Sequence, residues 1–201
     1  MKTTITSNKG GQGKTTISTL LAVITATREK EKAEKGKQAS TIYCCDLDKT
    51  QQNFRDNLSG YEDLKDIIKF VDGISDIPED ALGIIDTPSE LGKNTIEAIR
   101  MADILIVPII PAKHAVQGVK RIAAIRGSKT DLRIVANDWD GSAAQLEAEE
   151  ELINDGFVIR SKLRKYKRLT YNLDAQMDWY TGFTNAIIKT ITNVLRSLIT
   201  G

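Results

Sequence analysis

One glycine-rich segment near the start of the chain constrains its fold more than any other feature. The segment consists of Asn8, Lys9, Gly10, Gly11, Gln12, Gly13, Lys14, Thr15 and Thr16. A β-like run precedes it and a helical pattern follows, which is the context that a phosphate-binding loop requires. Glycines let successive backbone N–H groups turn inward around phosphates, and the helix N-terminus adds its positive end. The segment therefore predicts an α/β chain that binds a nucleotide.

The two lysines of this loop have different predicted roles. Lys14 is placed to reach the β- and γ-phosphates, and the Thr15 hydroxyl is placed to ligate Mg²⁺. The remaining predicted nucleotide contacts are Gly10, Gly11, Gln12, Gly13 and Thr16. The ordinary phosphate-loop pattern would have its first glycine at position 8, but that residue is Asn8, and Lys9 follows it directly.

Short apolar runs alternate with helical patterns along the chain. We expect strands at 2–7, 40–46, 81–86, 103–108, 132–137 and 157–159. We expect helices at 14–32, 92–101, 112–126 and 142–155. Near-continuous apolar strands between helices indicate one mostly parallel twisted sheet with helices on both faces, in a single domain spanning residues 1–201.

Two further expectations concern less regular segments. Residues 51–80 are expected to hold two short helices and a strand near Gly73–Ile77. Pro88, Pro108 and Pro111 are expected to mark sharp exits from strands, because proline cannot continue a central strand.

Composition agrees with an ordinary globular protein of 201 residues, 41% hydrophobic and 27% charged. The net charge of +1 does not favour a polyanion partner for the molecule as a whole, so nucleic-acid binding would need a local patch. No window of about 18 apolar residues and no signal-peptide pattern occurs, so a cytoplasmic location is expected. Adjacent Cys44 and Cys45 are expected to be buried packing residues, since neighbours in a strand face opposite sides.

Carboxylates follow two of the expected strands. Asp86 ends an apolar strand, which is the Walker B arrangement, and it would hold Mg²⁺ beside Thr15. Asp46 and Asp48 end a second strand and would lie on the same side if the segment were extended. We expect Asp46 to lie near the metal and Asp48 near the attacking water, or these roles exchanged; a solvated acidic turn is the alternative.

The segment from Lys9 to Thr16 resembles the deviant Walker A motif of the ParA/MinD family of ATPases. The resemblance extends to the segment ending in Asp86, and to the segment at Asp46 and Asp48, where Lys49 and Thr50 stand in place of the usual Pro-Gln. It implies that Lys9 reaches in trans to the partner's phosphates in an ATP-bound sandwich dimer. It also implies that Asn137 bonds adenine, although an asparagine at a strand end is also a common turn residue.

A basic stretch follows the last expected strand. Its members are Arg160, Lys162, Arg164, Lys165, Lys167 and Arg168. Such a stretch can contact duplex phosphates without reading sequence, and the resemblance to the ParA branch implies nonspecific DNA binding. A solvated face, or nucleotide and dimer contacts, are the alternatives.

The final helical pattern has an apolar stripe formed by Phe183, Ile187, Ile191, Val194, Leu195 and Leu198. MinD relatives end in a membrane-targeting helix, but a membrane-surface helix favours a polar face rich in Lys and Arg. Only Lys189 and Arg196 are available for such a face here, so we expect the stripe to dock against the sheet. His114, the sole histidine, is expected at the surface or as a cap.

The resemblance implies a Mg²⁺-dependent ATPase of weak intrinsic turnover for plasmid or chromosome segregation, most like a small plasmid-partition ParA protein. The expected partners are a second subunit, nonspecific DNA on the nucleoid and a ParB-like centromere-binding protein, with no membrane. The alternatives are a MinD-like membrane-cycling ATPase, a P-loop metabolic or cluster-assembly ATPase, and a degenerate switch that only binds nucleotide.

Overall fold

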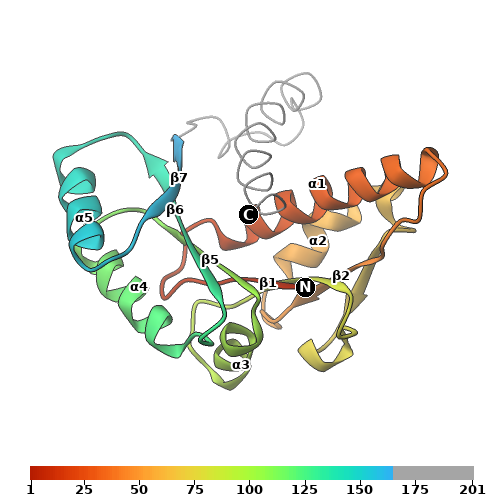
Figure 1. Cartoon of the computed structure of the whole chain (residues 1–201), viewed down its shortest axis with the longest axis horizontal. Coiled ribbons are helices and arrows are strands. Elements are labelled where there is room, and N and C mark those ends of the chain that lie inside the picture. Colours follow the sequence, from red (N-terminus) through yellow and green to blue (C-terminus); the bar gives the residue numbers. More distant parts are fainter. Residues whose placement is uncertain (165–201) are drawn as a thin grey trace.

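Strands form one parallel sheet in the computed structural model, which describes residues 1–164 (Figure 1). The strands are β1 (Lys2–Ile5), β2 (Ile42–Asp46), β3 (Ile68–Val71), β4 (Leu82–Asp86), β5 (Ile104–Ile109), β6 (Asp131–Trp139) and β7 (Ile159–Arg164). Their order across the sheet is β3-β2-β4-β1-β5-β6-β7, so β1 is central and its neighbours are β4 and β5. The predicted parallel α/β fold is confirmed.

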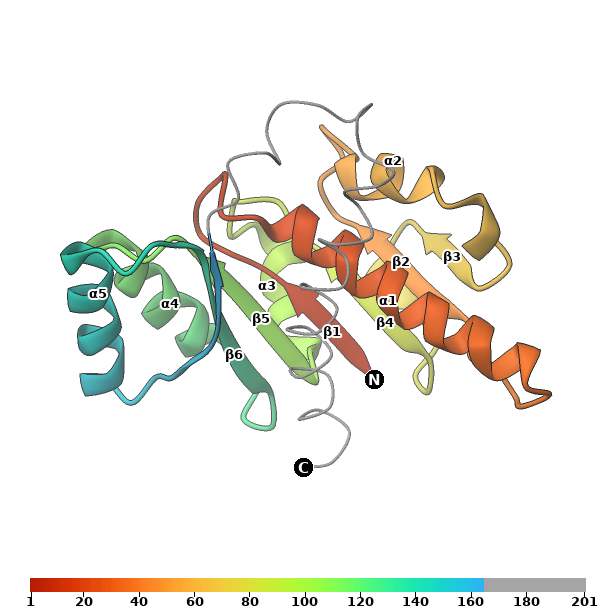
Figure 2. The same cartoon turned by 90° about the horizontal axis from the view of Figure 1, so that it is seen from above.

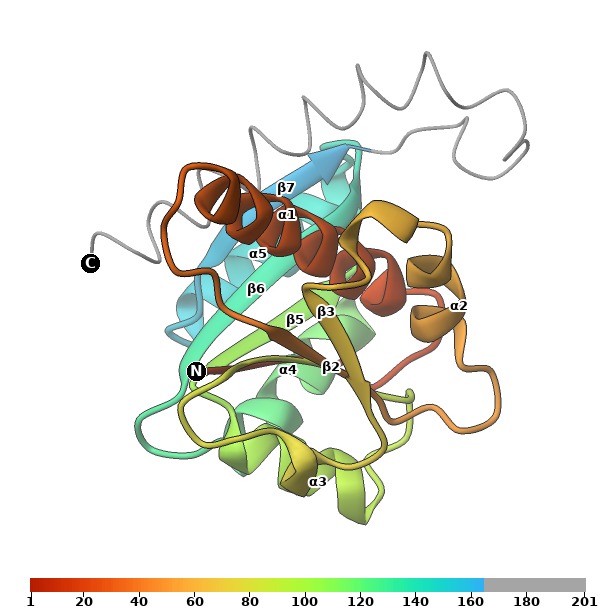
Figure 3. The same cartoon turned by 90° about the vertical axis from the view of Figure 1, so that its right-hand side faces the viewer.

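Within residues 1–164, the two faces of the sheet are covered by different numbers of helices. The helices are α1 (Lys14–Glu34), α2 (Asn53–Ser59), α3 (Lys93–Met101), α4 (Lys113–Ile125) and α5 (Ala143–Asn154). α1 and α2 pack on one face of the sheet, and α3, α4 and α5 pack on the other. Figure 3 shows α1 on one side of the strands and α3 and α4 on the opposite side.

The core follows the alternation of side chains along each strand. On β5, Ile104 and Ile106 face α1, whereas Leu105 and Val107 face α4. Such strands read as continuous apolar runs because both faces are buried. The two cysteines follow the same alternation, and both are fully buried as expected.

The prediction for residues 51–80 was wrong in its strand. The strand is β3 (Ile68–Val71), which pairs with β2, and Gly73–Ile77 instead contains the 3-10 turn η2 (Ile74–Asp76). Ile74 and Ile77 are both buried and lie three residues apart, which suits the inner side of a turn. The two expected short helices are α2 and the 3-10 turn η1 (Glu62–Leu64).

The expected exit at Pro108 was also wrong, because β5 continues through it to Ile109. The Thr6 N–H donates to the Ile106 carbonyl, so Ile106 turns its backbone groups toward β1, and Pro108 two residues later turns the same way. An N–H at position 108 would therefore point at the Thr6 carbonyl, and because proline lacks it, pairing of β5 with β1 ends at Ile106 while pairing with β6 continues to Ile109.

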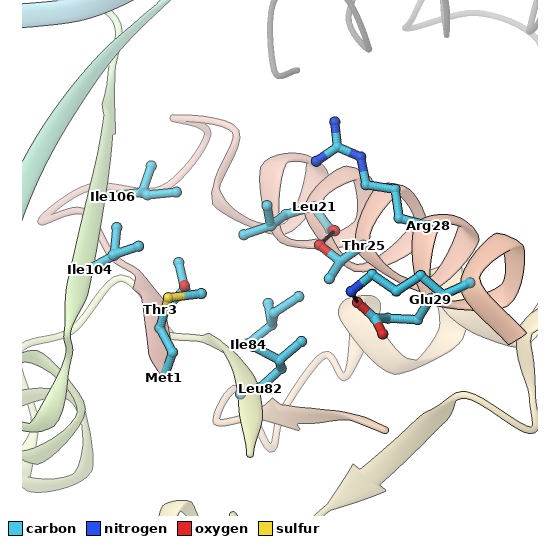
Figure 4. A pocket seen from close by; sticks show the side chains of 12 residues that line it. Met1, Thr3, Leu21, Thr25, Arg28, Glu29, Leu82, Ile84, Ile104 and Ile106 are labelled. Atoms are coloured by element: carbon cyan, nitrogen blue, oxygen red, sulfur yellow. Dashed lines mark hydrogen bonds and ion pairs between the residues drawn. The ribbon is translucent and has the colours of Figure 1, made fainter. Parts of the chain in front are cut away.

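An apolar cavity of about 380 Å³ lies between the C-terminal half of α1 and the sheet. Figure 4 shows Leu21 of α1 and Ile84, Ile104 and Ile106 of the sheet around the same space, with Arg28 at its rim. The strands contribute residues of their amino ends, including Met1 and Leu82. The cavity is therefore at the opposite edge of the sheet from the glycine loop, which follows the carboxyl end of β1 (Figure 2).

Some predictions concern residues outside the described part of the chain. These residues are Lys165, Lys167 and Arg168 of the basic stretch and the apolar stripe between Phe183 and Leu198. Within residues 1–164 no helix combines the length and the apolar character needed to cross a membrane.

Candidate functional site

The glycine loop connects β1 to α1 and depends on left-handed backbone at two positions. Gly11 has φ of 73° and Gly13 has φ of 87°, values that glycine adopts without a steric cost. Gly13 is also the N-cap of α1, and a Cβ there would lie 2.4 Å from Nδ2 of Asn137. The loop therefore requires glycine at position 13 for both its backbone and its surroundings.

Gln12 anchors the loop to the strands on one side. Its Oε1 accepts the Ile110 N–H at 2.6 Å, just beyond β5. Its carbonyl accepts Nδ2 of Asn137 on β6 at 3.2 Å. The predicted base-contacting residue Asn137 thus lies at the loop, where its amide supports the backbone; a contact with adenine stays a prediction.

Lys14 is buried at the start of α1. Its ammonium donates to the hydroxyls of Ser89 at 2.9 Å and Ser7 at 3.3 Å. Burial lowers the pKa of this ammonium, while the Asp86 and Asp48 carboxylates act in the opposite direction. The two hydroxyls occupy donor sites of the ammonium that phosphate oxygens would take.

Thr15 and Asp86 meet as the sequence predicts. The Thr15 hydroxyl donates to Oδ2 of Asp86 at 2.8 Å, and the Ser18 hydroxyl lies at the same distance from Oδ1. Asp86 is 2% exposed, and this burial raises its pKa to about 6. The exposed Thr16 follows in the first turn of α1.

Asp46 is the register partner of Asp86 on the neighbouring strand. Its Oδ1 accepts the Asp48 N–H, and its Oδ2 accepts the N–H groups of Phe54 and Arg55 at the start of α2. Asp46 therefore lies near the predicted metal position, but both of its oxygens already bind backbone donors.

Asp48 does not continue the strand, so the expectation of an extended Asp46–Asp48 pair was wrong. The strand ends at Asp46, whose carboxylate folds the next residues into a turn. Asp48 accepts the Thr50 hydroxyl at 2.6 Å and the N–H groups of Thr50 and Gln51. The bond from the Thr50 hydroxyl is the largest cause of the lowered pKa of Asp48. Thr50, one of the residues that departs from the family pattern, thus holds the carboxylate expected to orient water.

Lys9 lies on the exposed outer side of the loop. The Ser7 hydroxyl donates to its carbonyl at 2.9 Å. Its ammonium contacts Nε2 of His114 on α4 at 3.4 Å. His114 is at the surface as expected, but it does not cap α4, since no side chain caps that helix.

Only part of the basic stretch can be placed. Arg160 and Lys162 are exposed on β7. The Lys162 ammonium donates to Glu149 at 2.7 Å and lies 4.2 Å from the centre of the Trp139 ring. Part of its charge is therefore compensated within the chain, and Arg160 is the better candidate for a phosphate contact.

Several residues at this site were not predicted from sequence. Ser7 and Ser89 hold Lys14, and Ser18 holds Asp86. A signal existed for Ser89, which stands where the ParA/MinD pattern has a second proline after Asp86. Another existed for Ser18, which is four residues after Lys14 and so lies on the same side of α1.

The residues present fit a nucleotide with Mg²⁺. The Thr15 hydroxyl and the Asp86 carboxylate are oxygen groups of the kind that Mg²⁺ prefers. Within residues 1–164 no group of three or more His, Cys, Asp or Glu side chains is placed to hold a metal by itself. A cation here would therefore depend on nucleotide oxygens as well, which is usual for Mg²⁺.

Comparison with protein families agrees with this geometry. The model of the CobQ/CobB/MinD/ParA nucleotide-binding domain matches residues 3–175. No curated protein sequence matches significantly.

Solved structures share the fold at low sequence identity. A putative plasmid partition protein from Borrelia burgdorferi B31, bound to AMPPNP, has a TM-score of 0.61 and 17% identity, covering 98% of this chain and 97% of that one. Apo McdA from Cyanthece has a TM-score of 0.62 and 19% identity, covering 84% and 87%. The MinD cell division protein of Aquifex aeolicus has a TM-score of 0.55 and 14% identity, covering 84% of each chain. At such identities the likeness establishes the fold.

Proposed function

Because the chain belongs to the CobQ/CobB/MinD/ParA family of nucleotide-binding domains, we propose that it is a ParA-type ATPase for DNA segregation, a single P-loop domain spanning residues 1–201. ATP closes two subunits face to face, the dimer binds nonspecific DNA, and a ParB-like partner stimulates hydrolysis. The structural neighbour described as a putative plasmid partition protein, bound to AMPPNP, supports the nucleotide and the biological process.

The observation that carries this proposal is the placement of the two lysines. Lys14 is buried and directed at hydroxyls around the loop, whereas Lys9 is exposed and its ammonium lies against α4. Within its own subunit Lys9 is therefore displayed outward, as a residue that reaches a second subunit must be. A positive charge supplied in this way stabilises the charge that develops during phosphoryl transfer.

The other residues of the site have separate roles in binding and hydrolysis. Lys14 and the loop N–H groups bind the phosphates, and Asp48 orients the attacking water. Thr15 and Asp86 hold Mg²⁺, with Asp46 beside them. Mg²⁺ supplies positive charge next to the phosphate oxygens. Turnover by the isolated protein is slow, since the site is completed only when subunit and partner are both present.

The DNA contact is assigned to the basic stretch from Arg160 to Arg168. Arg160 is exposed on β7. Binding to phosphates alone is independent of sequence and weakens steeply with salt.

The experiment is binding to an arbitrary DNA duplex with ATP, with ADP and without nucleotide, over a series of salt concentrations. We expect tight binding with ATP only, with a steep salt dependence. Arg160→Ala should weaken it, whereas Lys129→Ala, which removes an exposed charge in the loop between α4 and β6, should not. Absence of DNA binding in every nucleotide state would contradict the segregation role, and binding to liposomes would then be measured.

A further inference from the structure

We propose that His114 is a positioning residue that holds the Lys9 side chain ready for the second subunit. This inference rests on the proposed function, because it gives His114 its role through Lys9. The observation behind it is the contact of 3.4 Å between the Lys9 ammonium and Nε2 of His114, two residues that are 105 positions apart in the chain.

The chemistry of this contact fixes the state of the imidazole. An ammonium can only donate hydrogen bonds, so Nε2 must be the nitrogen without a proton. The ring is then neutral, with its proton on Nδ1.

Contacts between the glycine loop and α4 hold Lys9 and His114 close to each other. The Gln12 side chain binds the Ile110 N–H three residues before α4, which ties the segment that leads into this helix to the loop. Gly118 lies one turn after His114, and a Cβ there would lie 2.2 Å from Oδ1 of Asn8. The absence of a side chain at position 118 thus lets α4 approach the loop next to Lys9.

The backbone of Lys9 is fixed as well. The Ser7 hydroxyl donates to the Lys9 carbonyl and also accepts from the Lys14 ammonium. The Lys9 main chain is therefore connected to the buried lysine, and only its exposed side chain needs orientation. An unrestrained lysine side chain loses rotamer entropy when it is fixed. His114 lowers that cost before the subunits meet.

The first test observes the contact directly and does not depend on activity. His114 is the only histidine, so untagged protein labelled with ¹⁵N has imidazole signals from one residue. We expect the tautomer with the proton on Nδ1, and a shift of the Nε2 signal in Lys9→Met. The matched control Lys113→Met, which removes an exposed charge beside His114 in α4, should change it less. An unchanged signal in Lys9→Met would overturn the proposal.

The second test separates positioning from folding. We expect His114→Ala to lower kcat for ATP hydrolysis and ATP-dependent dimerisation about fivefold, with KM for ATP unchanged. His114→Gln should recover most of this loss, because its amide oxygen accepts a hydrogen bond. In the Lys9→Met background His114→Ala should have no further effect. An equal loss in that background, or a failure of glutamine to recover activity, would overturn the proposal.

The two tests also distinguish this inference from the proposed function. If Lys9→Met dimerises and turns over normally although its imidazole signal shifts, the proposed role of Lys9 in trans is wrong, and that of His114 falls with it. If Lys9→Met is inactive but the signal does not shift, the proposed function stands and only the positioning role is wrong.

Discussion

The carboxylate of Asp86 is 2% exposed at the carboxyl end of β4, where burial raises its pKa to about 6. An unfolded aspartate has a pKa near 3.9, so the folded protein binds the proton more tightly. Stability from this group is complete below about pH 4 and is lost as the pH rises through about 6. At neutral pH the nucleotide-free protein therefore holds a costly buried charge.

We predict that Asp86→Asn stabilises the nucleotide-free protein at neutral pH by about 2 kcal/mol, because it removes this charge while keeping the shape. The lost attraction to Lys14 subtracts some of the gain. Chemical denaturation at neutral pH and near pH 4 measures the effect, and the gain should vanish at the lower pH. Binding of ATP with Mg²⁺ should be lost in the same variant. Lower stability of Asp86→Asn at neutral pH would contradict this account of the site.

Replacing Asp46 by alanine should affect the stability of the protein more than replacing Asp48. Asp46 is buried and accepts three backbone N–H groups, two of them at the start of α2. Asp46→Ala leaves those donors without an acceptor and should lower the free energy of unfolding by about 2–4 kcal/mol. Asp48→Ala is the control: thermal unfolding should change little, while ATP hydrolysis falls. Equal unfolding midpoints for the two variants would show that Asp46 does not support the fold.

Sequence reasoning identified the residues that bear charge at the site, but not the hydroxyls that hold them. Lys14, Thr15 and Asp86 belong to a motif whose spacing has a chemical reason. Ser7, in contrast, is an ordinary strand-end residue, and its two contacts arise only when the loop folds back over it. Single serines carry no pattern, so their role becomes visible with the geometry.

At the scale of elements, the glycine loop combines two constraints at one position. Gly13 has a left-handed backbone conformation, and a Cβ added at this position would clash with the Asn137 side chain. We predict that Gly13→Ala weakens nucleotide binding at least tenfold, because a left-handed alanine costs about 1–2 kcal/mol and Asn137 must also move. Isothermal calorimetry with an ATP analogue measures this loss.

Gly10→Ala is the matched control for the fold. A Cβ at Gly10 would meet its nearest neighbour, the Ser89 hydroxyl, at an ordinary 3.7 Å. Its thermal stability should therefore match that of the wild type, whereas Gly13→Ala should unfold at a lower temperature. A Gly13→Ala protein with wild-type stability and affinity would refute the strained-loop interpretation.

Long elements were predictable from sequence because their periodicity extends over many residues. α1 was expected at 14–32 and spans Lys14–Glu34. The short strand β3 was missed, since four residues give little periodicity and pairing with β2 decides their conformation. The continuation of β5 through Pro108 was missed for a related reason, because it depends on the pairing of β5 with β6.

At the scale of the whole molecule, the sheet faces differ in their cover within residues 1–164. The face that carries α1 leaves an apolar cavity of about 380 Å³ beside Leu21, Ile84 and Ile104 (Figure 4). The chain continues for residues 165–201, and their apolar stripe is the predicted occupant of this side of the sheet.

We predict that Ile191→Asp, in the stripe, lowers the thermal unfolding midpoint and increases binding of a hydrophobic dye, because it places a charge against an apolar surface. Asn193→Asp introduces the same charge outside the stripe and should leave both quantities near their wild-type values. Similar behaviour of the two variants would show that the stripe does not dock on the sheet. Vesicle binding that Ile191→Asp abolishes would instead support a membrane role.

The central claim is that ATP joins two subunits through Lys9, and the molar mass in solution tests it most directly. Light scattering after size exclusion should give the mass of one chain without nucleotide and with ADP, and twice that mass with a non-hydrolysable ATP analogue and Mg²⁺. Lys9→Ala should bind the analogue but remain at the mass of one chain. A wild-type protein that stays monomeric with the analogue, or a Lys9→Ala protein that dimerises as readily as the wild type, would contradict the account.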